Sequence, residues 1–319
     1  MLKGLALTPP VIGRIAIGKV VERHGKRLPE KDDEFTITSQ IQNKDGWIAH
    51  PFNDALRKEG QKLRSIPIRL LFDDPDLNFR ANYSLFDRQS GRPVCVGDGE
   101  TCRRVTSAGM QALPCPSPMA CSIGAAGNCK PYGRLHVRIR SDNAKDGEKE
   151  RHPEDELGSF IFRTTGFNSI RTLATRLRYF KAVSGDRLAC MDLELRLRGK
   201  STTQSQRTPI YYVDITTKTG SSLEAAVNEA RQRREQQTQA GIDQSLLDEA
   251  ARGGYAMGEF EESEEETVGV MEEFFSDAGQ DDLLEDGQEK PPSPGGAAPA
   301  LAMKLQRKAS AHPSAAAAA

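Results

Sequence analysis

The chain has 319 residues, of which 44 are Lys or Arg and 45 are Asp or Glu, and its mean hydropathy is -0.57. This composition is too polar for one compact globule of this length, so it predicts that part of the chain is unfolded. The first 21 residues are interrupted by Pro9-Pro10, Arg14 and Lys19, and no run in the chain approaches about 18 apolar residues. We therefore expect a cytoplasmic protein without a membrane partner.

Charge is divided unevenly along the chain. Residues 259–290 hold 14 acidic side chains and one basic side chain. The whole chain has a net charge of -1. Because residues 259–290 carry -13 and residues 291–319 carry +3, residues 1–258 carry +9. A basic body gains affinity for polyanions through counterion release, so the charge favours a nucleic-acid-handling system over a metabolic enzyme. A solvated basic surface without a polyanion partner is the alternative.

The first 218 residues have the pattern of a β-rich body. Apolar and charged residues alternate over 135–139 and 191–197, which predicts strands with one solvated face. Shorter signals of the same kind lie at residues 12–20, 35–38, 66–72, 81–86, 160–164 and 211–215. Because few helices separate these strands, we expect an antiparallel sheet and an α+β fold.

One amphipathic helix stands out within this body. Its apolar residues follow the i, i+3, i+4, i+7 pattern, namely Ile170, Leu173, Ala174 and Leu177. Asn168 or Ser169 is placed to cap its first turn. Its opposite face is basic, with Arg171, Thr175, Arg176, Arg178 and Lys181. This face could contact phosphate or an acidic protein, or it could only solvate a core helix.

A helical pair and a tail follow the body. Ser221 to Glu224 forms a capping box for a long helix that Gly241 ends, and Asp243 can cap a second helix over 244–252, closed by Gly253-Gly254. We therefore divide the chain into a β-rich domain at 1–218, a helical segment at 219–256 and a disordered tail at 257–319. The tail is acidic and then rich in Pro and Ala. Its acidic part could cover the basic body or act as a solubilising tail.

Five of the six cysteines lie between Cys95 and Cys129. In a reducing cytosol such clustering favours metal ligation over disulfides, and zinc is the metal that closed thiolate sites prefer. The spacing is Cys95, x19, Cys115, x5, Cys121, x7, Cys129, with Cys102 as a fifth thiol. A tetrahedral site needs four, and spacing alone leaves Cys95 and Cys102 interchangeable.

The chain resembles a known family through an ordered set of motifs. These are Gly13-Arg14-Ile15, Phe35-Thr36-Ile37-Thr38-Ser39, Cys95-Val96-Gly97-Asp98-Gly99-Glu100, Arg103-Arg104, Pro114-Cys115-Pro116, Cys121, Cys129-Lys130-Pro131-Tyr132-Gly133-Arg134-Leu135, and the run from Gly158 through Gly166-Phe167-Asn168 to Ser169. Over about residues 12–218 they are similar to the recombination directionality factors that partner large serine integrases on phages and other mobile genetic elements. Some relatives are loosely labelled hydrolase or metal-binding protein. The chain departs from the better-known phage members in its wider gap from Cys115 to Cys121 and in everything after residue 220.

The resemblance implies a regulator that works by binding and not by catalysis. Such a factor docks on a serine integrase seated on attachment-site DNA and favours excision over integration. It contacts DNA directly or through the integrase and takes no small-molecule substrate. The resemblance also implies one structural zinc in a loop-rich knuckle, held by Cys95, Cys115, Cys121 and Cys129, with Cys102 as a spare.

Two other functions compete with this interpretation. The first is an autonomous zinc-containing nucleic-acid-binding protein. Its candidate contacts, which equally suit a partner surface, are Arg103, Arg104, Arg134, Arg138, Arg140, Arg171, Arg176 and Arg178. The second is a metal-dependent hydrolase.

The residues argue against the hydrolase. Four thiolates leave no open position for a water, and the histidines are too scattered for a catalytic metal motif, at His24, His50, His136, His152 and His312. The acids Asp73, Asp74 and Asp76 suit a turn with Pro75 better than a two-metal site. We therefore predict that the protein is not an enzyme and that it has no catalytic residues.

Overall fold

The computed structural model describes residues 11–23, 26–43, 46–57, 60–124, 128–140, 158–201 and 209–255, together with Met271 and Phe274. All of these belong to one compact unit, residues 1–277, and the second unit comprises residues 278–319. The tail predicted at 257–319 therefore lies outside the described residues except at Met271 and Phe274.

Strands dominate the described residues. They are β1 (Val11–Arg23), β2 (Lys26–Asn43), β3 (Gly46–Ala49), β4 (Ser65–Arg69), β5 (Phe79–Phe86), β6 (Pro93–Gly97), β7 (Thr101–Thr106), β8 (Gly109–Pro114), β9 (Cys129–Ile139), β10 (Ser159–Thr164), β11 (Leu193–Lys200) and β12 (Ile210–Thr217). The helices are α1 (Pro51–Ala55), α2 (Pro75–Asn78), α3 (Phe167–Ser184), α4 (Leu223–Gln239) and α5 (Gln244–Tyr255), with the 3-10 turn η2 (Leu188–Cys190). The predicted α+β class is confirmed, and each predicted strand corresponds to one observed here.

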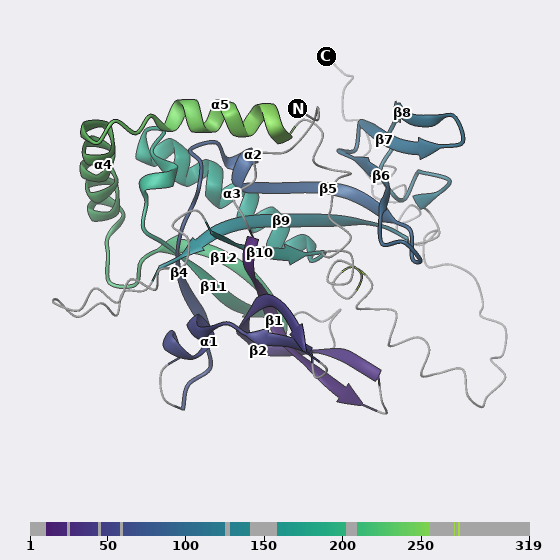
Figure 1. The fold of residues 1–319 in the computed structure, drawn as a ribbon, viewed down its shortest axis with the longest axis horizontal. Helices are drawn as coiled ribbons and strands as arrows, with labels where there is room; N and C mark the ends of the chain where they lie inside the picture. Colours follow the sequence, from purple (N-terminus) through teal and green to yellow (C-terminus); the bar gives the residue numbers. More distant parts are fainter. Residues whose placement is uncertain are drawn as a thin grey trace, which may run out of the picture. The chain divides into compact units, whose positions relative to one another are not determined.

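The strands form one branched sheet with β9 at its centre. The order is β3-β2-β1-β10-β9-β5-β6-β7-β8, and β4, β11 and β12 branch from the end of β9, where Ile139 pairs with Ile68. Figure 1 shows β5 and β9 side by side, with the β6–β8 meander at the end of β5. The pairings are antiparallel, as predicted, except that β1 and β10 run parallel.

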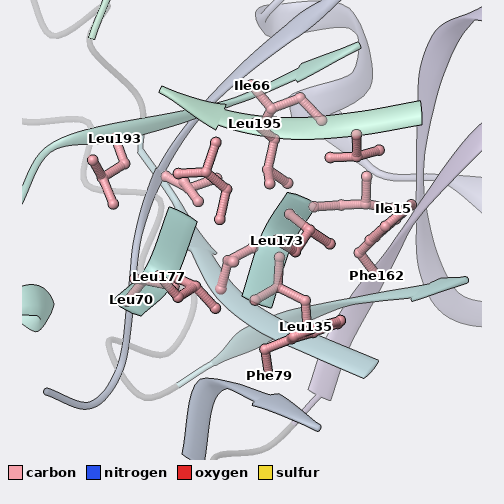
Figure 2. Packing of buried hydrophobic residues seen from close by; sticks show 14 of the residues in the cluster. Ile15, Ile66, Leu70, Phe79, Leu135, Phe162, Leu173, Leu177, Leu193 and Leu195 are labelled. Atoms are coloured by element: carbon pink, nitrogen blue, oxygen red, sulfur yellow. The ribbon is translucent and has the colours of Figure 1, made fainter. Parts of the chain in front are cut away.

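The amphipathic helix is confirmed as α3, which packs into the branch of the sheet. Leu173 and Leu177 are fully buried. Figure 2 shows Leu173 between Leu195 of β11 and Leu135 of β9, and Leu177 beside Leu70. Further core side chains come from both arms of the sheet, including Ile15, Ile66, Phe79, Phe162 and Leu193. Burying such side chains from two layers is the main source of stability for this architecture.

The predicted cap of α3 is wrong. The N-cap is Gly166, which makes no side-chain cap bond. The Ser169 hydroxyl instead accepts the backbone N–H of Val213 at 3.1 Å, and the Asn168 side chain accepts from Lys200 at 2.7 Å. Both side chains tie the helix to neighbouring strands and are therefore unavailable to its first turn.

The C-terminal helical pair is confirmed and packs on the body. Ser222 caps α4 by accepting the N–H of Ala225. The cap therefore lies one residue after Ser221, and Glu224 is not at the N3 position that the predicted capping box requires. The helix α5 differs from expectation because it runs through Gly253 to Tyr255. Its Asp248 accepts the backbone N–H groups of two residues before α2, at 3.1 and 2.9 Å. No helix among the described residues is long and apolar enough to cross a membrane.

Candidate functional site

The prediction of a loop-rich knuckle underestimated the strand content of the cysteine region. Cys95 lies in β6, Cys102 in β7, and Cys129 is the first residue of β9. The turn between β6 and β7 closes because the Asp98 carboxylate accepts the N–H groups of Glu100 and Thr101, both at 2.8 Å. Acidic turn residues do this routinely. The motif after Cys95 is therefore a hairpin turn that sets the position of the first thiol.

Strand register brings the thiols to one face. Leu85 of β5 pairs with Cys95 on one side and with Cys129 on the other, so the three side chains point the same way. Gly97 lies opposite Cys102 in the next strand. A Cβ on Gly97 would stand 2.7 Å from the Cys102 Cβ and 2.8 Å from the Cys115 Sγ. Only glycine therefore lets Cys115 approach this face.

A single guanidinium links two of the thiols. Arg104 of β7 donates from Nε to Cys95 Sγ at 3.5 Å and from Nη2 to Cys121 Sγ at 3.6 Å. Backbone N–H groups of Gly124 and Ile123, with help from Arg104, lower the pKa of Cys121. Hydrogen bonds to a thiolate stabilise its charged form, so this environment favours the thiolate of Cys121.

The thiols of this region affect one another's ionisation. Burial, followed by the charges of Cys95, Cys115 and Cys121, raises the pKa of Cys129 to about 11. The Cys102 thiol also donates a hydrogen bond to the carbonyl of Pro114 at 3.8 Å. Burial and its contact with Cys95 raise the pKa of Cys102 to about 11, which favours the protonated thiol.

The donor chemistry of this cluster suits zinc, but its geometry is not that of a formed site. Among the described residues, no three His, Cys, Asp or Glu side chains are placed so that together they could hold a metal ion. The Arg104 guanidinium bridges Cys95 and Cys121, where a shared cation would have to compete with it. The zinc and its ligand set therefore stay predictions.

The arginines proposed as binding residues do not form one surface. Arg140 pairs with Asp192 at 2.7 Å and Arg176 pairs with the buried Asp214 at 3.0 Å, so both serve the fold. The others are dispersed: Arg103 and Arg104 lie on β7, Arg134 and Arg138 on β9, and Arg171 and Arg178 on the exposed side of α3.

The structure instead places Arg134 in a row that the sequence did not reveal. Arg80 of β5 and Arg163 of β10 pair with Arg134 from its two sides, so three guanidinium-bearing positions lie directly across adjacent strands. Burial and the charges of these three arginines lower the pKa of His136 to about 3, so this histidine is neutral at physiological pH. One sequence signal was available. In β10, Phe160 and Phe162 face the core, and Arg163 follows Phe162 directly, so its side chain points to the opposite face of the sheet.

Several of the described histidines and acids hold backbone groups or neighbouring side chains in place. The imidazole Nδ1 of His50 accepts the N–H of Phe52 at the start of α1, so it serves as a helix cap. Asp74 caps α2, as the turn hypothesis predicted. Asp73 accepts from the N–H of Ala189 and from Arg234. His24, His152 and His312 lie outside the described residues.

The fold and the cysteine cluster define a β-rich α+β protein with a basic body, and comparison with known proteins places it in a family. A family model described as Gp3-like, recombination directionality factor-like, matches residues 12–218. The chain therefore belongs to this family, and the predicted resemblance is confirmed over the predicted range. No curated protein and no solved structure matches the chain.

Proposed function

We propose that the protein is a non-enzymatic regulator of site-specific recombination that binds a serine integrase on attachment-site DNA and favours excision over integration. The observation that carries this proposal is the family match over residues 12–218, which spans the whole sheet, α3 and the cysteine cluster. The coarser conclusion, a protein of the recombination directionality factor-like family, follows from the match itself.

The mode of action is a shift between integrase arrangements. A factor that binds one arrangement more tightly than another moves the equilibrium by its differential affinity. A tenfold change in the ratio of excision to integration requires a difference of about 1.4 kcal/mol in that affinity. An interface of ordinary size can supply this without any bond being made or broken by the factor.

The cysteine cluster would hold one structural zinc in this function. Cys95, Cys115, Cys121 and Cys129 are the proposed ligands, because the family resemblance implies them, Arg104 links Cys95 to Cys121, and Cys102 instead donates to the carbonyl of Pro114. Zinc bound by four thiolates supplies folding energy and no open position for chemistry. Its role would be to fix the end of β6 and the start of β9 in one shape.

A gel-shift assay separates this function from autonomous nucleic-acid binding, which the positive charge of residues 1–258 favours. Attachment-site DNA is titrated with the full chain, with and without the serine integrase of the same mobile element. A directionality factor shifts the integrase–DNA complex further and leaves DNA alone unmoved at the same concentration. An autonomous binder retards DNA by itself, with a steep dependence on salt. The same retardation with and without integrase, and no further shift of the integrase–DNA complex, would contradict the proposal.

A further inference from the structure

One buried carboxylate, that of Asp214 in β12, holds two arginines from different elements. Asp214 is only 2% exposed. Its Oδ1 accepts a hydrogen bond from Nε of Arg176 in α3 at 3.0 Å, and its Oδ2 accepts one from Nε of Arg198 in β11 at 2.7 Å. A buried charge is tolerated only when it is paired, so Asp214 needs both partners and thereby fixes the orientation of both guanidinium groups.

The two guanidinium groups keep most of their donors for another anion. Arg176 and Arg198 each use only Nε on Asp214, and neither makes a further hydrogen bond to a described residue. Their side chains are 43% and 41% exposed. Because arginine presents five N–H donors in a planar fork, the remaining edges suit the oxygens of a phosphate or a carboxylate. The buried acid therefore pre-orients two solvent-facing donors.

Lys200 adds a third cation beside this pair. Arg198 and Lys200 are two residues apart in β11, so their side chains share a face of the sheet. The Lys200 ammonium donates to Asn168 Oδ1 at 2.7 Å, which holds it against the first turn of α3. We call these groups the cation face. It consists of three cations and one acid, with a net charge of +2, namely Arg176, Arg198, Lys200 and Asp214.

The composition of the cation face favours a phosphate backbone over an acidic protein as its occupant. The centre of a protein interface is built on buried apolar anchors and is depleted in charged residues. Here the centre is a carboxylate surrounded by cations, with the ring of Tyr212 centred 6.0 Å from the Lys200 ammonium at its side. A polyanion needs no apolar anchor, because its affinity comes from counterion release. The charge of +9 on residues 1–258 attracts it from a distance.

We propose that the cation face contacts the phosphate backbone of duplex DNA without reading its base sequence. Backbone contacts position a protein on the duplex and carry no sequence information. The choice of DNA as the polyanion rests on the proposed function, in which the factor acts on an integrase seated on attachment-site DNA. The inference deepens that function, because it gives the factor a DNA contact of its own.

The salt dependence of DNA binding tests the contact on the purified full chain. The chain is titrated into a short labelled duplex of arbitrary sequence at several salt concentrations, and binding is followed by fluorescence anisotropy. Each neutralised phosphate contributes about -0.9 to the slope of log K against log salt. Three contacts on the cation face therefore contribute about -2.7 to that slope. No integrase is present, so the result does not depend on the recombination role.

A double variant and a matched control locate the contact. Arg198→Gln with Lys200→Gln removes two of the three cations and leaves Asp214 paired with Arg176. Its slope should be shallower by about 1.8. The control, Arg178→Gln with Lys181→Gln, removes the same charge from another part of α3 and should keep the slope. Both of its cations lie more than 3.5 Å from their nearest acids, at 3.9 and 3.7 Å.

A charge-retaining variant keeps the test decisive if the double variant does not fold. Arg198→Lys preserves the charge beside Asp214 and loses the planar fork. It should keep the slope and bind the duplex more weakly than the unaltered chain. Circular dichroism and the melting temperature show which variants are folded.

Two outcomes would overturn the inference. One is an equal slope and affinity in the unaltered chain and the folded double variant, or in the unaltered chain and Arg198→Lys if the double variant does not fold. The other is an unaltered chain that binds no duplex at low salt. A chain that binds duplex through the cation face but leaves the direction of recombination unchanged would contradict only the proposed function.

Discussion

Arg233 of α4 donates to Asp192 at 3.0 Å and thereby joins this helix to the β-rich body. The same carboxylate receives Arg69 of β4 at 2.8 Å and Arg140 of β9 at 2.7 Å, and Asp192 is only 6% exposed. One buried acid thus connects three elements that lie far apart in the sequence. The helix α4 is held to the sheet by this ion cluster and has only a thin apolar stripe, in which Ala226 and Ala230 are buried.

Removal of this carboxylate should weaken the fold. Asp192→Asn leaves three arginines around a neutral side chain, and breaking a buried ion pair in this way costs about 3 kcal/mol. Urea denaturation at neutral pH measures the loss. The matched control is Asp76→Asn, because Asp76 is exposed and its nearest cation, on Arg178, is 3.9 Å away. Its free energy of unfolding should change by less than about 0.5 kcal/mol.

The Asp192 carboxylate should also make the free energy of unfolding depend on pH. Burial raises the pKa of Asp192, but the hydrogen bond and charge of Arg69, with Arg140 and Arg233, outweigh it and hold the pKa below its ordinary value. A lowered folded-state pKa contributes stability above the unfolded value of about 3.9, and that contribution is lost as pH falls through the folded value. The stability difference between the unaltered chain and Asp192→Asn should therefore be constant above about pH 5 and shrink below pH 4. A difference independent of pH would contradict this.

The cysteine cluster should bind about one zinc per chain when the protein is purified without chelator. Each of Cys95→Ser, Cys115→Ser, Cys121→Ser and Cys129→Ser should lose it. Cys102→Ser should keep it, because that thiol donates to the carbonyl of Pro114. Metal content by mass spectrometry checks the set. A protein that folds without zinc, or that loses zinc only in Cys102→Ser, would refute the proposed ligands.

The close approach of Cys115 to Gly97 allows a second test of the packing in the cysteine region. Gly97→Ala places a Cβ less than 3 Å from the Cys102 Cβ and the Cys115 Sγ, so it should destabilise the protein by about 1–3 kcal/mol. Gly253→Ala in α5 meets nothing within 4 Å, and it should stabilise the helix by about 1 kcal/mol. Thermal denaturation measures both effects: the melting temperature should fall in Gly97→Ala, where a Cβ has no room, and rise in Gly253→Ala, where it has room.

Much of the fold could be predicted because alternation and helical periodicity are local signals. The strand around Leu135 and the helix around Leu173 both present a regular apolar stripe, and both are observed. The strands β7 and β8 were missed because only one of their residues, Cys102, is buried, so they have no apolar alternation. The end of α5 was placed too early because Asp248, held by backbone N–H groups of the body, keeps a glycine-containing helix in place.

The candidate site was predictable only in part, because its contacts depend on how distant strands pair. The cysteine positions follow from spacing and resemblance, but the approach of Arg104 to two thiols depends on the register between β6 and β7. The arginine row was missed because Arg80 and Arg163 lie 83 positions apart in the sequence. They meet only through Arg134, which long-range strand pairing places between them.

The most direct test of the central claim is the direction of recombination. Reporter plasmids carrying the element's attachment sites, in the integrated and the unintegrated configuration, are incubated with its serine integrase, with and without the full chain. The proposed function predicts that excision rises and integration falls when the chain is added. Equal rates in both directions, from a chain that is folded and zinc-loaded, would contradict it.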